Sequence, residues 1–240
     1  MTAPTYDPRS FPPFAVTVDI VVLTVTTRLE VLVIERGGDP FAGSWALPGG
    51  FVLPDESVDA AADRELLEET GLTRGKLEDI HLEQLGTFGA VDRDPRMRVV
   101  SVAYLALSPV QPQPTAGTDA VAAHWVPVDD ALAAPLAFDH HQILAAAVDR
   151  AGAKLEYTTL ATSLAGPDFT LGELQHVYEA VWGQPLDRAN FRRKVLATQG
   201  FVVPTGKRRT GKRGGAPGTV YRPGAGGVME PPLMRDEVRL

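Results

Sequence analysis

The feature that most constrains the fold is a glycine-containing loop followed by a helix with three closely spaced glutamates. The pattern comprises Gly50, Glu56 and the run Arg64-Glu65-Leu66-Leu67-Glu68-Glu69-Thr70-Gly71-Leu72. A helix predicted over 57–70, ended by the glycine at 71, places the three glutamates on one face because residues three and four apart are one turn apart. Like charges this close repel unless a cation lies among them, and Mg²⁺ and Mn²⁺ prefer oxygen ligands. The spacing therefore indicates a metal site.

This pattern resembles an intact Nudix box, the signature of hydrolases that cleave nucleoside diphosphates linked to another moiety. The resemblance implies that Mg²⁺ or Mn²⁺ is held by Gly50, Glu56, Glu65, Glu68 and Glu69, of which Glu65, Glu68 and Glu69 are the catalytic candidates. We expect Arg64 to point off the glutamate face and to pair with a carboxylate that holds the loop. The alternative is a solvated acidic helix face, and turnover also needs a base and a water that the box does not specify.

Short β-strands are predicted around the box. Alternating or dense aliphatic residues predict strands over 16–22, 29–34, 82–90, 98–106 and 124–128. Pro48-Gly49-Gly50 is expected to start a loop that lasts to about Glu56. With the box, these elements predict an α/β protein whose N-terminal domain, residues 14–135, is a Nudix α/β/α sandwich.

The segment from Thr87 to Arg96, with Arg98 and Ser101, resembles part of the Nudix proteins that handle ADP-ribose. The resemblance implies that Phe88 stacks on a base and that Arg36, Arg93 or Arg96 contacts phosphate or ribose. Each of these residues is equally well explained as a surface charge or a loop brace. Trp45 is expected to pack in the core. Asp139-His140-His141 favours a helix cap over a metal site, because adjacent histidines point in different directions on a helix.

Charge is unevenly distributed along the chain. The net charge is −7, yet the segment from Arg188 to Arg222 contains ten basic and no acidic residues, which leaves a balance of −17 on the rest. Such asymmetry indicates a polyanionic partner for one part of the chain only.

The pattern of a winged helix surrounds this basic segment. Thr170 and Glu173 form a capping-box pattern that starts a helix ending near Trp182, and Asp187 is suited to cap a second helix over 188–199. Each helix has an apolar stripe, made of Leu171, Leu174, Val177 and Tyr178 in the first and Phe191, Val195 and Leu196 in the second. Strands over 201–203 and 219–221 flank a basic loop over 206–218, and residues 223–240 are expected to form a flexible tail.

The stretches 169–180 and 186–194, with Gly206 and the basic loop, resemble the winged helix-turn-helix of the Nudix-related transcriptional regulators of NAD metabolism. The resemblance implies a winged helix DNA-binding domain over residues 139–223. Arg and Asn side chains recognise base edges and Lys and Arg neutralise phosphates. The expected DNA-binding residues are Arg188, Asn190, Arg192, Arg193, Lys194, Lys207, Arg208, Arg209, Lys212 and Arg213. The alternative is a solvated basic helix and loop.

The sequence thus predicts a repressor of NAD-metabolism genes that senses ADP-ribose or a related nucleotide. It is expected to bind a palindromic double-stranded operator as a homodimer. The rival hypothesis is an Mg²⁺- or Mn²⁺-dependent ADP-ribose pyrophosphatase, or a bifunctional protein, because the box is intact. The longest apolar stretch near the N-terminus is broken by Thr17, Asp19 and Thr24, and residues 1–11 lack a basic start of signal type. We therefore expect a cytoplasmic protein without a membrane segment.

Overall fold

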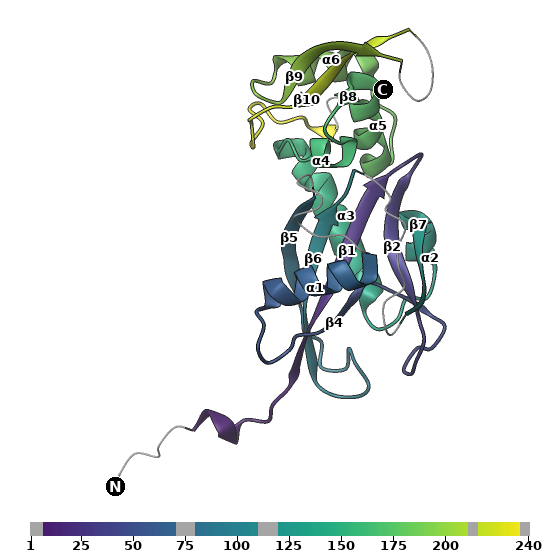
Figure 1. The fold of residues 1–240 in the computed structure, drawn as a ribbon, viewed down its shortest axis with the longest axis vertical. Helices are drawn as coiled ribbons and strands as arrows, with labels where there is room; N and C mark the ends of the chain where they lie inside the picture. The colour runs from purple at the N-terminus through teal and green to yellow at the C-terminus, as the bar shows by residue number, and fades with distance from the viewer. Residues whose placement is uncertain (1–6, 71–79, 110–119, 211–215, 236–240) are drawn as a thin grey trace.

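The computed structural model describes residues 7–70, 80–109, 120–210 and 216–235. Figure 1 shows a module built on a large sheet and, stacked above it, a smaller module that contains the basic segment. Residues 7–14, with the 3-10 helix η1 (Pro8–Ser10), extend away from the sheet module. Within the described residues, no helix is long and apolar enough to cross a membrane.

The larger module is built on a mixed seven-stranded sheet. Its strands are β1 (Ala15–Val25), β2 (Leu29–Arg36), β3 (Trp45–Ala46), β4 (Gly49–Phe51), β5 (His81–Phe88), β6 (Val99–Leu107) and β7 (Ala120–Pro127). Strands β1 and β6 run parallel at the centre, β2 and β5 pair antiparallel beside them, β3 and β7 pair with β2, and β4 pairs with β1. All five predicted strands are present. The loop predicted from Pro48 is wrong at its start, because Gly49–Phe51 pairs with β1.

Helices cover both faces of this sheet. Even-numbered residues 18–22 of β1 pack in one cluster with helix α1 (Val58–Thr70), whereas odd-numbered residues 21–23 pack on the face of helix α3 (His140–Tyr157). This division follows from the alternation of side chains along a strand. The short helix α2 (Val128–Ala133) follows β7. The predicted α/β/α sandwich is confirmed, while Gly71, the expected helix end, lies outside the described residues.

The smaller module is a winged helix. Helices α4 (Ala161–Ala165), α5 (Leu171–Trp182) and α6 (Arg188–Ala197) accompany a sheet of β8 (Phe169–Thr170), β10 (Gly218–Pro223) and β9 (Val202–Arg209). The predicted capping box is confirmed, since Thr170 Oγ1 accepts from Glu173 N and the Glu173 carboxylate accepts from Thr170 N. Asp187 caps α6 by accepting from Asn190 N at 2.7 Å.

Two details of this module differ from the sequence prediction. Strand β9 reaches Arg209, so Lys207, Arg208 and Arg209 lie on a strand rather than in the loop, because β9 pairs with β10 as far as Gly218. Leu196, assigned to the apolar stripe of the second helix, is 46% exposed, whereas Phe191 and Val195 are buried. Helical geometry explains this, since residue 196 lies about 100° beyond the buried side marked by residue 195.

The two modules share one hydrophobic core. A single cluster of buried side chains extends from the α3 face of the large sheet to Leu174, Phe191 and Phe201 of the winged helix. Polar contacts strengthen the junction: His176 Nε2 donates to the carbonyl of Thr26 at 2.7 Å, and Trp182 Nε1 donates to the carbonyl of Gly152 at 3.0 Å. Helix α5 is therefore attached directly to the sheet module and to α3.

The segment after β10 packs back on the junction, which corrects the prediction of a flexible tail for its described part. Met229 N donates to the carbonyl of Tyr157, and Leu233 N donates to the carbonyl of Glu156, both at 2.8 Å. Arg235 Nε donates to the buried carboxylate of Glu156 at 2.7 Å. Met229 and Leu233 are 2% and 3% exposed. Two buried apolar side chains, two backbone hydrogen bonds and the Arg235–Glu156 contact thus anchor this segment to the end of α3.

Replacing Leu233 with alanine should lower the free energy of unfolding by about 2–5 kcal/mol, because a buried aliphatic side chain is lost. Val228 is 69% exposed, so Val228→Ala in the same segment should change stability by no more than about 0.5 kcal/mol. Urea unfolding followed by circular dichroism measures both variants. Equal effects of the two substitutions would show that the tail does not pack on the folded protein.

Candidate functional site

Arg64 lies among the carboxylates of the predicted box. Its Nη2 atom donates to Glu56 at 2.7 Å and to the carbonyl of Phe51 at 3.1 Å. Its Nη1 atom lies 2.7 Å from Glu65 and 3.3 Å from Glu68. The expected pairing with a loop carboxylate is confirmed. The expected direction is wrong, because the guanidinium folds back onto the glutamate face and neutralises charges that would otherwise repel one another.

Gly50 brings the backbone of β4 against Glu65. A Cβ atom at residue 50 would lie 2.1 Å from Glu65 Oε1, so a side chain there would displace the carboxylate. Burial raises the pKa of Glu65, although Arg64 acts in the opposite direction. Hydrogen bonds from Arg64 and from Leu53 N lower the pKa of Glu56. The carboxylate of Glu65 is therefore easier to protonate than usual, whereas that of Glu56 is held ionised.

The donor chemistry of the box suits a hard divalent cation, because it consists of carboxylate oxygens beside exposed backbone. Within the described residues, however, no group of three or more acidic or histidine side chains is arranged to bind a metal ion. Glu56, Glu65 and Glu68 surround the Arg64 guanidinium instead. Glu69 lies on α1, but its side chain lies outside the described part.

A cavity of about 710 Å³ opens beside the box, a size typical of small-molecule sites. Its lining includes Glu65 and Glu68 of the box, together with arginine, aspartate and phenylalanine side chains. Of the predicted ligand-binding residues, the structure brings Arg36, Arg93 and Arg96 to this cavity. Other side chains that line the cavity include Asp19, Phe51, Arg64, Asp94, Phe138 and His140.

Phe138 is the aromatic side chain around which the basic side of the cavity is built. The guanidinium groups of Arg36 and Arg96 lie 4.9 Å and 5.6 Å from its ring centre, and Phe41 packs edge-on against it at 4.9 Å. Its φ angle is +54°, a strained conformation for a bulky residue. Hydrogen bonds hold both arginines in place, from Arg36 to the carbonyl of Pro40 and from Arg96 to Asp94.

Buried charges form the floor of the cavity. The Arg93 guanidinium is 4% exposed and forms ion pairs with Asp139 at 2.6 Å and with Asp19 at 3.2 Å. Asp19 also accepts from Ser101 Oγ at 2.5 Å and lies 3.3 Å from His140 Nε2. Burial would raise the pKa of Asp19, but His140, Ser101 and Arg93 together lower it. This carboxylate is therefore ionised at neutral pH.

His140 also lines the cavity, and Asp139 pairs with Arg93 beside it. Leu47 N donates to His140 Nδ1 at 2.8 Å, so the ring proton is on Nε2, which points to Asp19. Asp139 stands at the N-cap position of α3, but its side chain makes no capping hydrogen bond, because it pairs with Arg93. His141 contacts the carbonyl of Leu132 instead, so the two histidines diverge as expected.

Phe88 does not take the place predicted for it. It is partly buried against the main core cluster, and it is not among the residues that line the cavity. Its position in β5 turns the ring toward the face of the sheet that α3 covers. Trp45 packs partly buried against the same cluster, as expected. Sequence reasoning missed Asp19 and Phe138, although an acidic residue within an apolar strand signalled Asp19.

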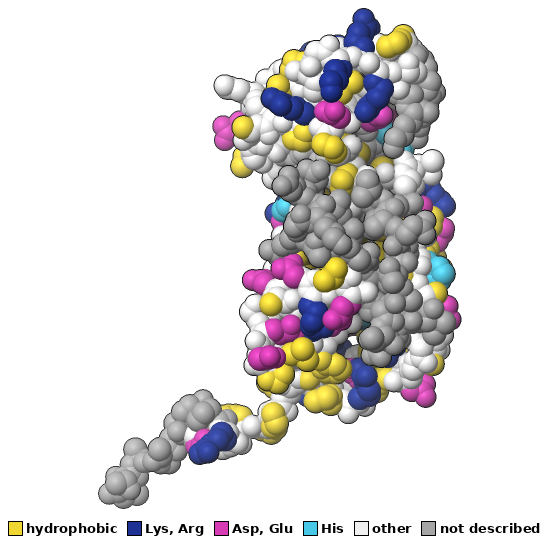
Figure 2. Space-filling view, in the orientation of Figure 1, with side chains coloured by type: hydrophobic (Ala, Val, Ile, Leu, Met, Phe, Trp, Pro, Cys, Tyr) yellow, Lys and Arg dark blue, Asp and Glu magenta, His cyan; other side chains and the backbone are white. Residues whose placement is uncertain are grey.

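Helix α6 presents half of the predicted DNA-binding residues. Arg188, Arg192 and Arg193 are exposed, and Arg193 Nη2 donates to the side-chain oxygen of Asn190. Lys194 is half-buried. Figure 2 shows Lys and Arg side chains gathered on the winged-helix end, with a few Asp and Glu side chains beside them, whereas the sheet module shows both kinds with many Asp and Glu side chains. The charge asymmetry of the sequence is thus an asymmetry in space.

The predicted wing residues have different surroundings. Arg209 Nη2 donates to the Glu173 carboxylate at 2.7 Å and to the carbonyl of Asp168 at 2.9 Å, so it holds β9 to the start of α5. Arg208 donates to the carbonyl of Pro217 across the hairpin at 2.7 Å. Lys207 is exposed on β9. Lys212 and Arg213 lie outside the described residues.

Two protein families match this chain. Residues 13–147 match the NUDIX domain, and residues 161–222 match the NrtR DNA-binding winged helix domain. The first match covers more than half of the chain. Both fall on the modules that the structure shows.

Individual proteins with this two-module order are also similar. The ADPR responsive transcriptional repressor NtrR of Acinetobacter baylyi is 38% identical over 90% of this chain and 85% of its own. The crystal structure of Shewanella oneidensis NrtR complexed with a 27mer DNA is 35% identical, with a TM-score of 0.72 over 87% of this chain and 93% of that one. The NUDIX domain of the same Shewanella protein complexed with ADP ribose is 37% identical, with a TM-score of 0.54 over 61% of this chain and 94% of that one. This chain, with its Nudix sandwich and its C-terminal winged helix, therefore belongs to the NrtR family of Nudix-related transcriptional regulators.

Proposed function

We propose that this protein is a transcriptional repressor whose Nudix module binds ADP-ribose or a closely related nucleotide and thereby changes the affinity of its winged helix for DNA. The observation that carries this proposal is the single core shared by the cavity module and the winged helix. A nucleotide-binding module that hydrolyses its ligand independently of DNA has no need of such a junction.

The cavity offers the groups that a diphosphate-linked nucleotide requires. Arg36 and Arg96, whose guanidinium groups lie over the ring of Phe138, provide positive charge for phosphates. The cavity volume of about 710 Å³ suits a nucleotide of this kind. The similar Shewanella domain, solved with ADP ribose, supports the choice of ligand.

Helix α3 supplies a physical route between the two sites. Its first turn contributes His140 to the cavity floor, and farther along it Gly152 accepts a hydrogen bond from Trp182 of α5. Its 18 residues span about 27 Å. A ligand that shifts the charges of the floor would move the winged helix as a rigid extension of α3. In a homodimer on a palindromic operator, such a shift would change the spacing of the two α6 helices.

The intact glutamate cluster keeps hydrolysis as a second candidate function. Glu56, Glu65, Glu68 and Glu69 are the residues that would hold a divalent cation, with Mg²⁺ or Mn²⁺ as the expected ions. When bound, this cation would polarise the diphosphate and lower the pKa of a bound water.

The regulatory proposal is tested by a gel shift on a duplex that the protein selects from a random library. Adding ADP-ribose should lower DNA affinity by about 5- to 150-fold, the usual range of coupling between two sites. Phe138→Ala should abolish most of this response while leaving DNA affinity without nucleotide unchanged. Phe14→Ala, which removes an exposed phenylalanine outside the cavity, is the matched control and should respond like the parent. If ADP-ribose still lowered the DNA affinity of Phe138→Ala as it does for the parent, the proposed role of Phe138 in nucleotide binding would be refuted.

Replacing both Glu68 and Glu69 with glutamine should abolish Mg²⁺- or Mn²⁺-dependent hydrolysis of ADP-ribose, because the oxygen ligands lose their charge. The affinity for DNA should stay within about twofold of the parent's, since Glu68 lies on the cavity and not on the winged helix. Chromatography of the nucleotide and fluorescence anisotropy with DNA measure the two properties. Loss of both in a folded variant would contradict separate sites, and lack of turnover in the parent would leave sensing as the role of the module.

A further inference from the structure

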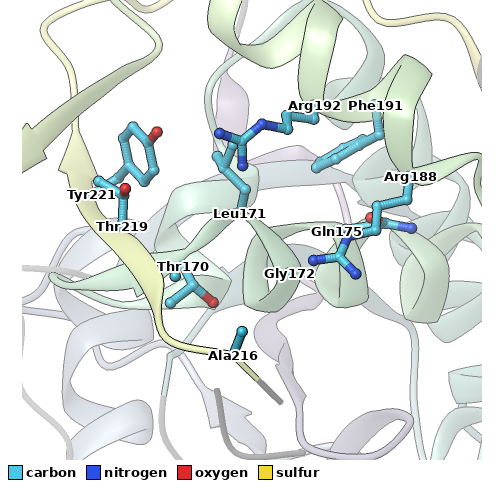
Figure 3. A pocket seen from close by; sticks show the side chains of 11 residues that line it. Thr170, Leu171, Gly172, Gln175, Arg188, Phe191, Arg192, Ala216, Thr219 and Tyr221 are labelled. Atoms are coloured by element: carbon cyan, nitrogen blue, oxygen red, sulfur yellow. The ribbon is translucent and has the colours of Figure 1, made fainter. Parts of the chain in front are cut away.

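A small pocket lies between α5, α6 and β10, apart from the nucleotide cavity. Its volume is about 140 Å³. Figure 3 shows Arg188 and Arg192 reaching into it from α6, with Thr219 and Tyr221 on the wing side and Gln175 behind Arg188. The helix α5 is open toward the pocket because Gly172 carries no side chain. The two guanidinium groups thus converge on one small space at the junction of helix and wing.

The electrostatic surroundings of the pocket suit an anion. Arg188 and Arg192 are the charged residues among its described lining. A nearby acidic group, Glu173, is neutralised, because its carboxylate accepts from Thr170 N at 2.7 Å and from Arg209 at 2.7 Å. Arg209 therefore acts as a positioning residue: it fixes the wing and cancels a charge that would repel an anion next to the pocket.

The size of the pocket restricts the anion. At about 140 Å³ it is smaller than the roughly 300 Å³ at which small-molecule sites begin, so a whole nucleotide does not fit. It has room for roughly four waters at about 30 Å³ each, which suits a single tetrahedral oxyanion. Gln175 contributes a wall rather than a donor, because its amide nitrogen already donates to Glu179 and to the carbonyl of Leu186.

The arrangement of α6 separates two groups of polar side chains. Arg188 and Arg192 are four residues apart and share one side of the helix, next to buried Phe191. Asn190 and Arg193 are three residues apart on another side, where they contact each other. One side therefore faces the wing pocket, and the other is directed away from the module.

We propose that this pocket holds one phosphate of the DNA backbone, bound by Arg188 and Arg192, so that these arginines position the duplex while Asn190 and Arg193 face base edges. This inference rests on the proposed function, since it requires that the winged helix bind duplex DNA. It divides the basic residues of α6 into backbone contacts and base contacts.

The salt dependence of DNA binding tests this division. Fluorescence anisotropy of the full chain is measured at several salt concentrations on a selected duplex and on a random one. The double variant Arg188→Ala with Arg192→Ala should bind both duplexes more weakly, by the same factor. It should also lower the slope of log affinity against log salt by about 0.9, the value for one lost phosphate contact. Arg188→Lys with Arg192→Lys should restore most of the slope, because a point charge suffices for a phosphate.

Arg193→Ala is the matched control on the same helix. It should narrow the affinity ratio between selected and random DNA, while its salt slope stays closer to the parent's. The proposal would be overturned if the Arg188 and Arg192 double variant lost its preference for selected over random DNA while its salt slope stayed unchanged. Because both arginines are exposed, the variants should melt at the temperature of the parent.

Neutral methylphosphonate linkages locate the contact. Such a linkage is placed at each position of the selected duplex in turn. At one position per half-site it should lower the DNA affinity of the parent protein but cause no further loss in the double variant. If no such position exists, the proposal is overturned. Calorimetry with ADP-ribose and with inorganic phosphate, without DNA, separates a backbone phosphate from a free one. Loss of ADP-ribose binding in the double variant would assign the pocket to the nucleotide instead. A parent protein that binds no duplex at low salt would refute the proposed function itself.

Discussion

The ion pairs of Arg93 hold together the parts of the chain on which the cavity beside the glutamate box depends. Its guanidinium joins Asp19 in the central strand β1 to Asp139 at the start of α3. Desolvating an arginine costs several kcal/mol unless its partners are well placed, and removing one partner of a buried pair typically costs about 3–5 kcal/mol. Here two carboxylates and the hydroxyl of Ser101 complete the arrangement. These paired charges therefore hold β1 and the start of α3 together at the floor of the cavity.

Helix α3 begins at this floor, so contacts at the floor fix the position of its first turn. Contacts with the winged helix fix its C-terminal end. Trp182 donates to Gly152, and the last described segment of the chain returns to bond with Glu156 and Tyr157. A long helix anchored at both ends transmits a displacement of one end to the other. The shared core and the ordered tail thus serve the same purpose, since each stops the winged helix from moving independently of the cavity.

Charge is arranged so that the two ligands use separate surfaces. In the sheet module, Arg64 neutralises the box glutamates, Arg93 pairs with Asp19 and Asp139, and Arg96 pairs with Asp94. In the winged helix, Arg188, Arg192 and Arg193 of α6 are exposed. The acidic remainder of the chain repels a DNA backbone, which leaves the basic end as the favoured surface for a polyanion.

The local pattern of the sequence determined the elements themselves. Alternation in β1, the glutamate spacing of α1 and the caps Thr170 and Asp187 each depend on neighbours along the chain, so they are readable without a fold. The composition of the cavity depended on tertiary structure. Phe138 rather than Phe88 reaches the cavity, because the pairing of β5 turns Phe88 toward the core, and Arg209 braces the wing, because β9 extends beside Glu173. Such roles require contacts between residues distant in sequence, and only the packing of sheets and helices brings those residues together.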